Sequence, residues 1–290
     1  MTAAAAPVVV WGNCQARPIA ALLREPLAAH GLQVLDVPTV FEATAEQVAW
    51  VREQVARAAV LVTQPIRDEY RHPGCGSEQL AALVPASGRV VRVPSTIHTG
   101  WFPYQANAHD EHGVRIPAPL VAYHDLRLLA AAAAGRSVDD VLAGGLGRSA
   151  DDDALRTAAA DSVAELRRRE QGADVAVSDL VDVPDAMFAM NHPANRTLGA
   201  IAERVLDHLG LDGEITLPER EFLGEIRTPV EQHVVAARGA GAVQPDWIVR
   251  REVVPWDDVV RAHLALYAEH PHVARDARIR WDERLAVLGF

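Results

Sequence analysis

The sequence has no lysine, only two cysteines, 5% aromatic residues and no long apolar run, and all 28 of its basic residues are arginine. Without lysine, the chain cannot supply a Walker-type lysine, a Schiff base or an anchor for pyridoxal phosphate. The formal net charge of −11 repels nucleic-acid phosphates and anionic lipid headgroups, so we expect neither nucleic acid nor a membrane as the main partner. An anionic ligand must therefore be met by a local group of arginines.

Two cysteines, Cys14 and Cys75, are too few for a disulfide framework in 290 residues, which favours a reducing, cytoplasmic location. The first ten residues lack the basic segment of a signal peptide, and the alanine-rich stretch 129–135 is too short to span a bilayer. With 49% hydrophobic and 23% charged residues, the composition is typical of a globular protein. We expect no export signal and no membrane anchor.

Short β-rich runs alternate with helical patterns in the N-terminal half. The runs cover residues 8–11, 33–37, 59–63 and 89–93, and the helical patterns cover 17–30, 43–57 and 77–84. This alternation predicts an α/β fold with a small parallel sheet, of the SGNH or flavodoxin-like type. The remainder is largely helical from 123 to 209, including an amphipathic helix at 151–169, and a strand at 247–253 and a helix at 257–270 follow.

We see no internal repeat and no long linker in the chain. We expect residues 1–214 to form an α/β catalytic domain. Residues 215–290 would then be a C-terminal extension packed on it, not necessarily a separate domain.

Cys14 stands where the first predicted strand meets the first predicted helix. Ligands of open parallel sheets bind beyond the carboxyl ends of the strands, and Gly12 and Asn13 supply a turn there. Pro18 is typical of an early helical position, so the thiol would lie near a helix N-terminus, where backbone N–H groups favour the thiolate. A free cysteine is more often a small buried residue, but this position favours a nucleophile.

A thiolate that takes part in acyl transfer normally needs a base nearby, and the chain offers twelve histidines. His192 is the best placed, because Pro193 stiffens its turn directly before an amphipathic helix. The alternative is a plain capping or turn residue. Together, Cys14 and His192 would form a Cys–His dyad.

Both segments resemble blocks of the SGNH-type hydrolases. Gly12-Asn13-Cys14 is similar to their first block with cysteine in place of the nucleophilic serine, and His192-Pro193 is similar to their last block. That block normally carries an acid three residues before the histidine, where this chain has Ala189. A dyad without the third member is chemically reasonable, because a cysteine depends less on an orienting carboxylate than a serine does.

A longer resemblance is to the WcbI-like polysaccharide-biosynthesis acetyltransferase family. The matching motifs occur in the family's order over roughly the first two thirds of the chain, at residues 12–15, 63–66, 94–104, 123–125, 165–170 and 187–193. The resemblance implies binding of coenzyme A and acetylation of sugars during the assembly of surface polysaccharides.

Coenzyme A carries phosphates that an acidic protein must meet with arginine. The candidates near the motifs are Arg17, Arg67, Arg92 and Arg196. Developing oxyanion charge needs donors that converge on one point, and the strand ends offer the backbone N–H groups of Cys14 and Gln15. The expected oxyanion and substrate-binding residues are Asn13, Gln15, Gln64, Ser95 and His98.

We therefore expect transfer of an acyl group, such as acetyl, from acyl-coenzyme A to a hydroxyl of a sugar or similar polar metabolite. His192 would either shuttle protons for an acylated Cys14 or activate the acceptor directly, with Cys14 only lining the thioester site. Two alternatives stay open: an SGNH-like thioesterase or esterase, and a non-catalytic coenzyme A-binding protein.

A zinc site is a competing interpretation. His72 with Cys75, and His109 with His112, form pairs at three-residue spacing, and Asp110 and Glu111 add oxygen ligands. These pairs lie in loop-like, proline-flanked stretches without an HExxH or a second CxxC motif, so we expect no metal.

Overall fold

The structure is a computed structural model that describes residues 5–110, 112, 114–146 and 150–290. The chain divides into two compact units, each assembled from three segments. Unit 1 contains residues 1–97, 165–181 and 191–223, and unit 2 contains residues 98–164, 182–190 and 224–290. This division differs from the expected boundary at residue 214, because residues 98–164 pack in one hydrophobic core with the C-terminal helices.

Unit 1 is built on a four-stranded parallel sheet with the order β2-β1-β3-β4. Its strands are β1 (Ala6–Trp11), β2 (Leu32–Val34), β3 (Val60–Thr63) and β4 (Arg89–Arg92). The register aligns Trp11 with Thr63 and Thr63 with Arg92, so three strands end together at one edge. The predicted α/β class and the four predicted strands are confirmed, although β2 ends at Val34 rather than at residue 37.

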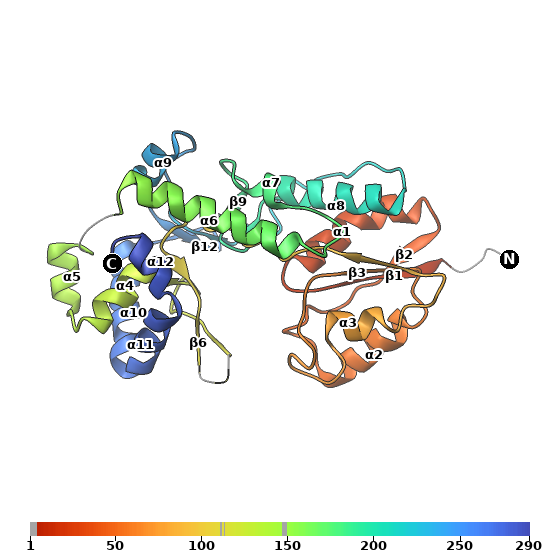
Figure 1. Ribbon diagram of the computed structural model, residues 1–290, viewed down its shortest axis with the longest axis horizontal. Helices are drawn as coiled ribbons and strands as arrows, with labels where there is room; N and C mark the ends of the chain where they lie inside the picture. Colours follow the sequence, from red (N-terminus) through yellow and green to blue (C-terminus); the bar gives the residue numbers. More distant parts are fainter. Residues whose placement is uncertain (1–4, 111, 113, 147–149) are drawn as a thin grey trace. The chain divides into compact units, whose positions relative to one another are not determined.

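Helices cover both faces of this sheet (Figure 1). Helix α1 (Ala16–Ala28) packs on β1 and β2 and against α8 (Asn195–Leu209), while α2 (Ala45–Val55) packs on β1 and against α3 (Ser77–Ala81). The central strands β1 and β3 are largely apolar runs because both of their faces are covered, whereas the edge strands β2 and β4 also contain exposed polar residues. Unit 1 also contains α7 (Ser178–Val181) and the short strand β10 (His192–Pro193).

The strand order creates a switch point at the carboxyl end of β1. The chain leaves β1 through α1 on one face and returns from β2 to β3 through α2 on the other face (Figure 1). Connections that diverge in this way leave a crevice beyond the strand end, where α/β proteins bind ligands. The segment that contains Cys14 connects β1 to α1 at this point.

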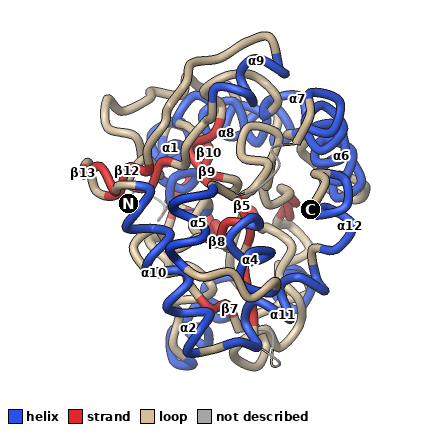
Figure 2. The backbone as a smooth tube through the Cα atoms, turned by 90° about the vertical axis from the view of Figure 1, so that its left-hand side faces the viewer, coloured by secondary structure: helices blue, strands red, loops and turns tan. Residues whose placement is uncertain are grey.

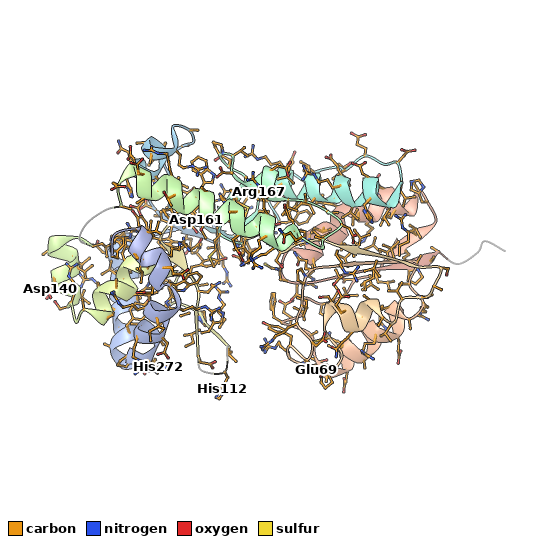
Figure 3. All side chains as sticks on the ribbon, in the orientation of Figure 1. Glu69, His112, Asp140, Asp161, Arg167 and His272 are labelled. Carbon is orange, nitrogen blue, oxygen red and sulfur yellow. The ribbon has the colours of Figure 1, made fainter. Side chains whose placement is uncertain are left out.

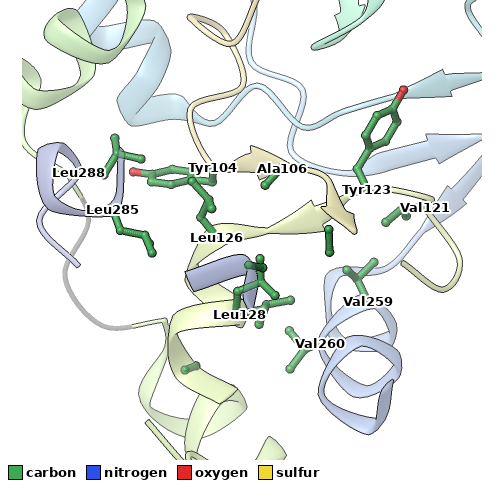
Figure 4. Packing of buried hydrophobic residues seen from close by; sticks show 14 of the residues in the cluster. Tyr104, Ala106, Val121, Tyr123, Leu126, Leu128, Val259, Val260, Leu285 and Leu288 are labelled. Atoms are coloured by element: carbon green, nitrogen blue, oxygen red, sulfur yellow. The ribbon is translucent and has the colours of Figure 1, made fainter. Parts of the chain in front are cut away.

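Unit 2 is mostly helical around its own hydrophobic core. Helix α4 (Leu126–Ala133) packs against α10 (Trp256–Glu269) and α11 (Pro271–Arg280), as Figure 2 shows. Residues of these helices meet Tyr104, Tyr123, Leu285 and others in one cluster (Figure 4). The other helices are α5 (Val138–Gly144), α9 (Gln232–Arg238) and α12 (Asp282–Val287), and α6 (Asp152–Glu170) contributes residues to both units.

The strands of unit 2 are short. They are β5 (Gln105–Ala106), β6 (Ala108–His109), β7 (Arg115–Ile116), β8 (His124–Asp125), β9 (Met187–Ala189), β11 (Ile226–Arg227), β12 (Trp247–Val249) and β13 (Glu252–Val254). Strands β5 and β8 pair antiparallel, as do β6 and β7, and β11-β12-β13 form an antiparallel sheet.

The structure corrects the predicted strand at 247–253. This segment is a hairpin, because Arg250 and Arg251 adopt left-handed conformations with φ of 52° and 73° and reverse the chain between β12 and β13. Glycine and asparagine usually occupy such positions, so two arginines do not indicate a turn in the sequence. The predicted helix at 257–270 is confirmed as α10, whereas α11 and α12 were not predicted.

Charged side chains such as Glu69, Asp140, Asp161 and Arg167 lie on the surface (Figure 3). Among the helices of the described residues, none combines the length and the apolar character needed to cross a membrane.

Candidate functional site

Cys14 lies in the turn between β1 and α1 and is half-buried. Glycine is required at position 12, because a Cβ there would collide with the side chain of Gln64. The Asn13 carbonyl accepts the Ala16 N–H (3.0 Å), and the Asn13 side chain accepts the Gln15 N–H (2.9 Å), which closes the turn. The first turn of α1 contains no acidic residue, so the positive end of the helix dipole is not neutralised within the helix.

Gln15 is fully buried and joins three parts of unit 1. Its Oε1 accepts hydrogen bonds from Gln64 Nε2 (2.9 Å) and from the Thr96 N–H (3.0 Å). Its Nε2 donates to the carbonyl oxygens of Thr96 (2.7 Å) and Asn191 (2.9 Å). The residue after Cys14 is thus bonded to the residue before His192.

Asn13, Gln64 and Ser95 continue this network across the strand ends. The Asn13 N–H donates to Gln64 Oε1 (2.9 Å), and Asn13 Nδ2 donates to Ser95 Oγ (3.2 Å). These residues follow β1, β3 and β4, whose carboxyl ends lie at one edge of the sheet. In the structure, as expected, four of the candidate residues lie together at that edge: Asn13, Gln15, Gln64 and Ser95.

The network also limits what Gln15 can do. Both polar atoms of its side chain and its backbone N–H are already engaged within the protein. Binding an oxyanion through Gln15 would require breaking buried hydrogen bonds, so its role in this structure is to hold the site together. Thr96 and Asn191 belong to the same network and were not singled out in the sequence, because they contribute backbone atoms that carry no side-chain signal.

His192 lies in β10, half-buried, at the entrance of α8. The chain after it is fixed by Asn195, whose N–H donates to Glu221 Oε2 (2.7 Å) and whose Nδ2 donates to the carbonyl oxygens of Pro218 and Arg220 (3.0 Å each). The predicted helix after His192 is confirmed. Because Asn191 is bonded to Gln15, the two segments that carry Cys14 and His192 belong to one rigid edge of unit 1.

The four candidate arginines have different surroundings. Arg17 lies 3.8 Å from Glu42, and Arg67 lies over the ring of Tyr70. Arg196 is exposed in the first turn of α8. Arg92 is bound by Glu78 through Nε (3.0 Å) and Nη2 (2.9 Å), and these hydrogen bonds lower the pKa of Glu78.

A cavity of about 370 Å³ opens at the carboxyl ends of β3 and β4. Arg67 and Arg92 line it, together with Gln64, which also contacts the Cys14 turn. Arg169 completes a group of three arginines there and was not predicted as a ligand. The sequence signal was the arginine run at 167–169, which looks like an ordinary helix end.

His98, expected among the substrate-binding residues, belongs to unit 2. It is fully buried, with Nδ1 3.1 Å from Ser162 Oγ and Nε2 3.2 Å from Asp182 Oδ1. Although burial raises the pKa of Asp182, the hydrogen bonds from His98 and Arg238 lower it overall. Both ring nitrogens of His98 thus face polar side chains of unit 2.

The residues considered for zinc have different surroundings in the structure. Cys75 is buried in the core beneath α2, and its carbonyl accepts the Trp11 indole N–H (2.9 Å). His72 Nε2 lies 3.0 Å from the Ala43 carbonyl oxygen. Glu111 lies outside the described residues. Within the described part of the chain, no group of three or more histidine, cysteine and acidic side chains is arranged to hold a metal ion.

Comparisons with known proteins agree with this architecture. Among curated proteins, no relative matches the chain. A solved structure is similar with a TM-score of 0.73 and 18% identity, covering 95% of this chain and 98% of the other. That protein is described as WcbI, a novel polysaccharide biosynthesis enzyme, in its native form without a disulfide bond between coenzyme A and a cysteine. The profile of the family "Polysaccharide biosynthesis enzyme WcbI" matches residues 7–214, and this chain therefore belongs to the WcbI family of polysaccharide biosynthesis enzymes.

Proposed function

We propose that the protein transfers an acyl group from acyl-coenzyme A to a hydroxyl of a sugar or similar polar metabolite, with Cys14 as nucleophile and His192 as proton carrier. The observation that carries the proposal is the hydrogen bond from Gln15 to Asn191, because it ties the Cys14 turn to the His192 segment at the switch point of the sheet. Both residues are half-buried, so neither is sealed from a substrate.

Two observations support coenzyme A as the donor. The similar solved protein is described in relation to a disulfide bond between coenzyme A and a cysteine, which a thiol near the cofactor's own thiol would explain. In this chain, the cavity lined by Arg67, Arg92 and Arg169 lies at the same edge of the sheet as the Cys14 turn. Guanidinium groups bind phosphate through paired charge-assisted hydrogen bonds, so Arg67 suits the phosphates of coenzyme A. Arg92 and Arg169 would have to exchange their exposed partners, Glu78 and Glu165, for a phosphate.

The reaction has two half-reactions. In the first, the Cys14 thiolate attacks the thioester carbonyl, the bond between the acyl carbon and the coenzyme A sulfur breaks, and protonated His192 gives its proton to the leaving thiolate. In the second, neutral His192 takes the proton of the acceptor hydroxyl, whose oxygen attacks the acyl group on Cys14 and releases the thiolate. The enzyme returns to its starting protonation state, and an ester and free coenzyme A are formed.

Intact mass spectrometry after addition of acetyl-coenzyme A tests the covalent step. We expect one acetyl group on the wild type, none on Cys14→Ala, and an unchanged increment on Cys75→Ala, which removes the buried thiol. His192→Ala should slow both formation and decay of the adduct. Turnover without any adduct would refute the nucleophile assignment.

Product analysis separates the proposal from its two alternatives. A transferase forms a new ester only when a sugar acceptor is present, whereas a thioesterase releases free acid at the same rate with and without it. A coenzyme A-binding protein without catalysis would bind the ligand but release no thiol, and Cys14→Ala would alter only its affinity.

A further inference from the structure

Unit 2 contains a cavity of about 620 Å³ that lies entirely within that unit. This volume falls in the range of about 300–1,000 Å³ that small-molecule sites occupy. Its wall includes four aromatic residues, Phe102, Tyr104, Trp247 and Trp256. Phe102, Tyr104 and Trp247 are only 3–4% exposed, whereas Trp256 is half-buried and leaves part of its ring open. An open aromatic face packs against the apolar C–H face of a ring, so Trp256 favours a ring-shaped ligand.

The charges around the cavity disfavour an anion. Arg127 donates to both oxygens of Asp125 (3.0 and 2.7 Å) and to both oxygens of Glu231 (3.1 and 2.7 Å). Its guanidinium also stacks over the Tyr104 ring, 3.8 Å from the centroid. Two carboxylates therefore hold the one arginine of the wall, and a phosphate would find no free guanidinium among the residues that line the cavity.

Two buried polar groups of the wall still lack a hydrogen-bond partner among the described residues. Gln105 is 3% exposed; its Oε1 accepts the Met190 N–H (2.7 Å), while Nε2 has no partner. Thr228 is 6% exposed, and its Oγ1 has no partner. Buried polar groups are normally paired, so an unpaired amide donor and an unpaired hydroxyl in one cavity wall point to a ligand that both donates and accepts.

The wall is held in place before any ligand arrives. Tyr104 Oη lies 2.9 Å from His233 Nε2, and the ring lies against the Arg127 guanidinium. Trp247 stacks on Tyr123, with 6.3 Å between the ring centroids. A preformed wall loses little conformational entropy when it binds, which suits a small ligand with few contacts.

We propose that this cavity binds a neutral carbohydrate, with a pyranose ring against the aromatic wall and its hydroxyl groups paired with Gln105 and Thr228. This binding lies within unit 2, does not require Cys14 and is independent of the function proposed above. A sugar phosphate or a nucleotide sugar would place its charged part beside Asp125 and Glu231, and the structure disfavours both.

Tryptophan fluorescence and calorimetric titration of the full chain with methyl glucoside, methyl mannoside and methyl galactoside test the proposal. We expect saturable binding of at least one glycoside. Thr228→Val should weaken it about tenfold, since one hydrogen bond is lost while the shape is kept. The same change should leave the melting temperature unchanged or raise it, because it removes an unpaired buried hydroxyl; Thr157→Val, on the exposed face of α6, is the matched control.

Trp256→Ala should also weaken binding at least tenfold, and Trp50→Ala, in an exposed position on α2 in unit 1, controls for the loss of one fluorophore. Tetramethylammonium and inorganic phosphate serve as cationic and anionic probes. The proposal is overturned if no glycoside saturates, if both cavity variants bind like the wild type, or if either ion binds in a Trp256-dependent manner.

The two proposals fail in different ways. Cys14→Ala should still bind the glycoside with wild-type affinity. Retained sugar binding without acyl transfer would refute the proposed function alone. An acylated Cys14 in a protein that binds none of the glycosides would refute the assignment of this cavity alone.

Discussion

Gln15 Nε2 donates a hydrogen bond to the carbonyl oxygen of Asn191 across 176 positions of the chain. Through this bond and its three companions, one buried side chain connects the ends of β1, β3 and β4 with the segment that leads into α8. Every polar atom of the amide has a partner, so the network is fully satisfied and favours one arrangement of the edge.

Gln15→Leu should destabilise the protein by roughly 2–4 kcal/mol, because it leaves buried groups of Gln64, Thr96 and Asn191 without partners. Urea unfolding measures the effect. Gln33→Leu, at an exposed position of β2, should stay within about 0.5 kcal/mol of the wild type. Equal stability of Gln15→Leu and the wild type would show that the network does not hold this edge together.

The stability of the protein should fall on acidification because of two buried histidines in unit 2. Burial lowers the pKa of His124 and of His263 from 6.5 to about 4. The unfolded chain therefore binds protons at a higher pH than the folded chain does. Stability is fully present above pH ~6.5 and is lost as the pH falls toward 4, by up to about 3 kcal/mol for each histidine.

Urea unfolding between pH 7.5 and 4.5 checks this dependence. His263→Leu should flatten the profile, because one of the two groups no longer titrates. His272→Gln removes an exposed imidazole (Figure 3) and serves as the control. If the control flattened the profile as much as His263→Leu, the pH dependence would not arise from the buried pair.

Arg127 should be indispensable for the stability of unit 2. Its removal in Arg127→Leu leaves Asp125 buried and Glu231 half-buried without their shared cation, which should cost roughly 3–5 kcal/mol. Arg127→Lys should also destabilise, because an ammonium group cannot bind two carboxylates bidentately. Thermal and urea unfolding should place Arg261→Leu, at an exposed position on α10, close to the wild type; lysine restoring full stability would contradict the bidentate role.

The β12–β13 hairpin offers a route to higher stability. Arg250 and Arg251 both have positive φ, a conformation that is less favourable for arginine than for asparagine or glycine. The double substitution Arg250→Asn with Arg251→Gly should stabilise the protein by about 1 kcal/mol. As a contrast, Arg261→Gly in α10 should destabilise by a similar amount, since glycine disfavours helix. A destabilised hairpin variant would mean that the arginine side chains contribute more than the backbone strain costs.

Coenzyme A affinity should depend on the arginines of the 370 Å³ cavity. Arg67→Ala and Arg92→Ala should each weaken coenzyme A by roughly 10–100-fold, the effect of losing a charge-assisted hydrogen bond. Pantetheine, which lacks the phosphates, should bind the wild type and both variants equally. Arg24→Ala, at an exposed position on α1, is the control. An equal loss of pantetheine binding would point to misfolding or to a different site for the phosphates.

Local patterns were sufficient to predict the sheet of unit 1. Buried parallel strands are continuous apolar runs, and the helices between them carry their own start signals, such as the Thr44 capping box of α2. The Cys14 turn could be predicted as well, since Gly12, Asn13 and Pro18 define a strand-to-helix connection. The hairpin at Arg250 and Arg251 could not be predicted, because arginine disfavours the positive φ that both residues adopt.

The sequence by itself determined the α/β alternation, the elbow that holds Cys14 and the helix that follows His192, because these depend on interactions between near neighbours. Only the tertiary structure decided that the polar atoms of the Gln15 side chain are all hydrogen-bonded in a buried network. It also decided that Arg169 lines the same cavity as Arg67 and Arg92, and that His98 contacts Ser162 and Asp182. It also placed Gln105 and Thr228 in the wall of one cavity. Such pairings join residues far apart in the chain, and packing of whole elements, rather than local preference, brings them together.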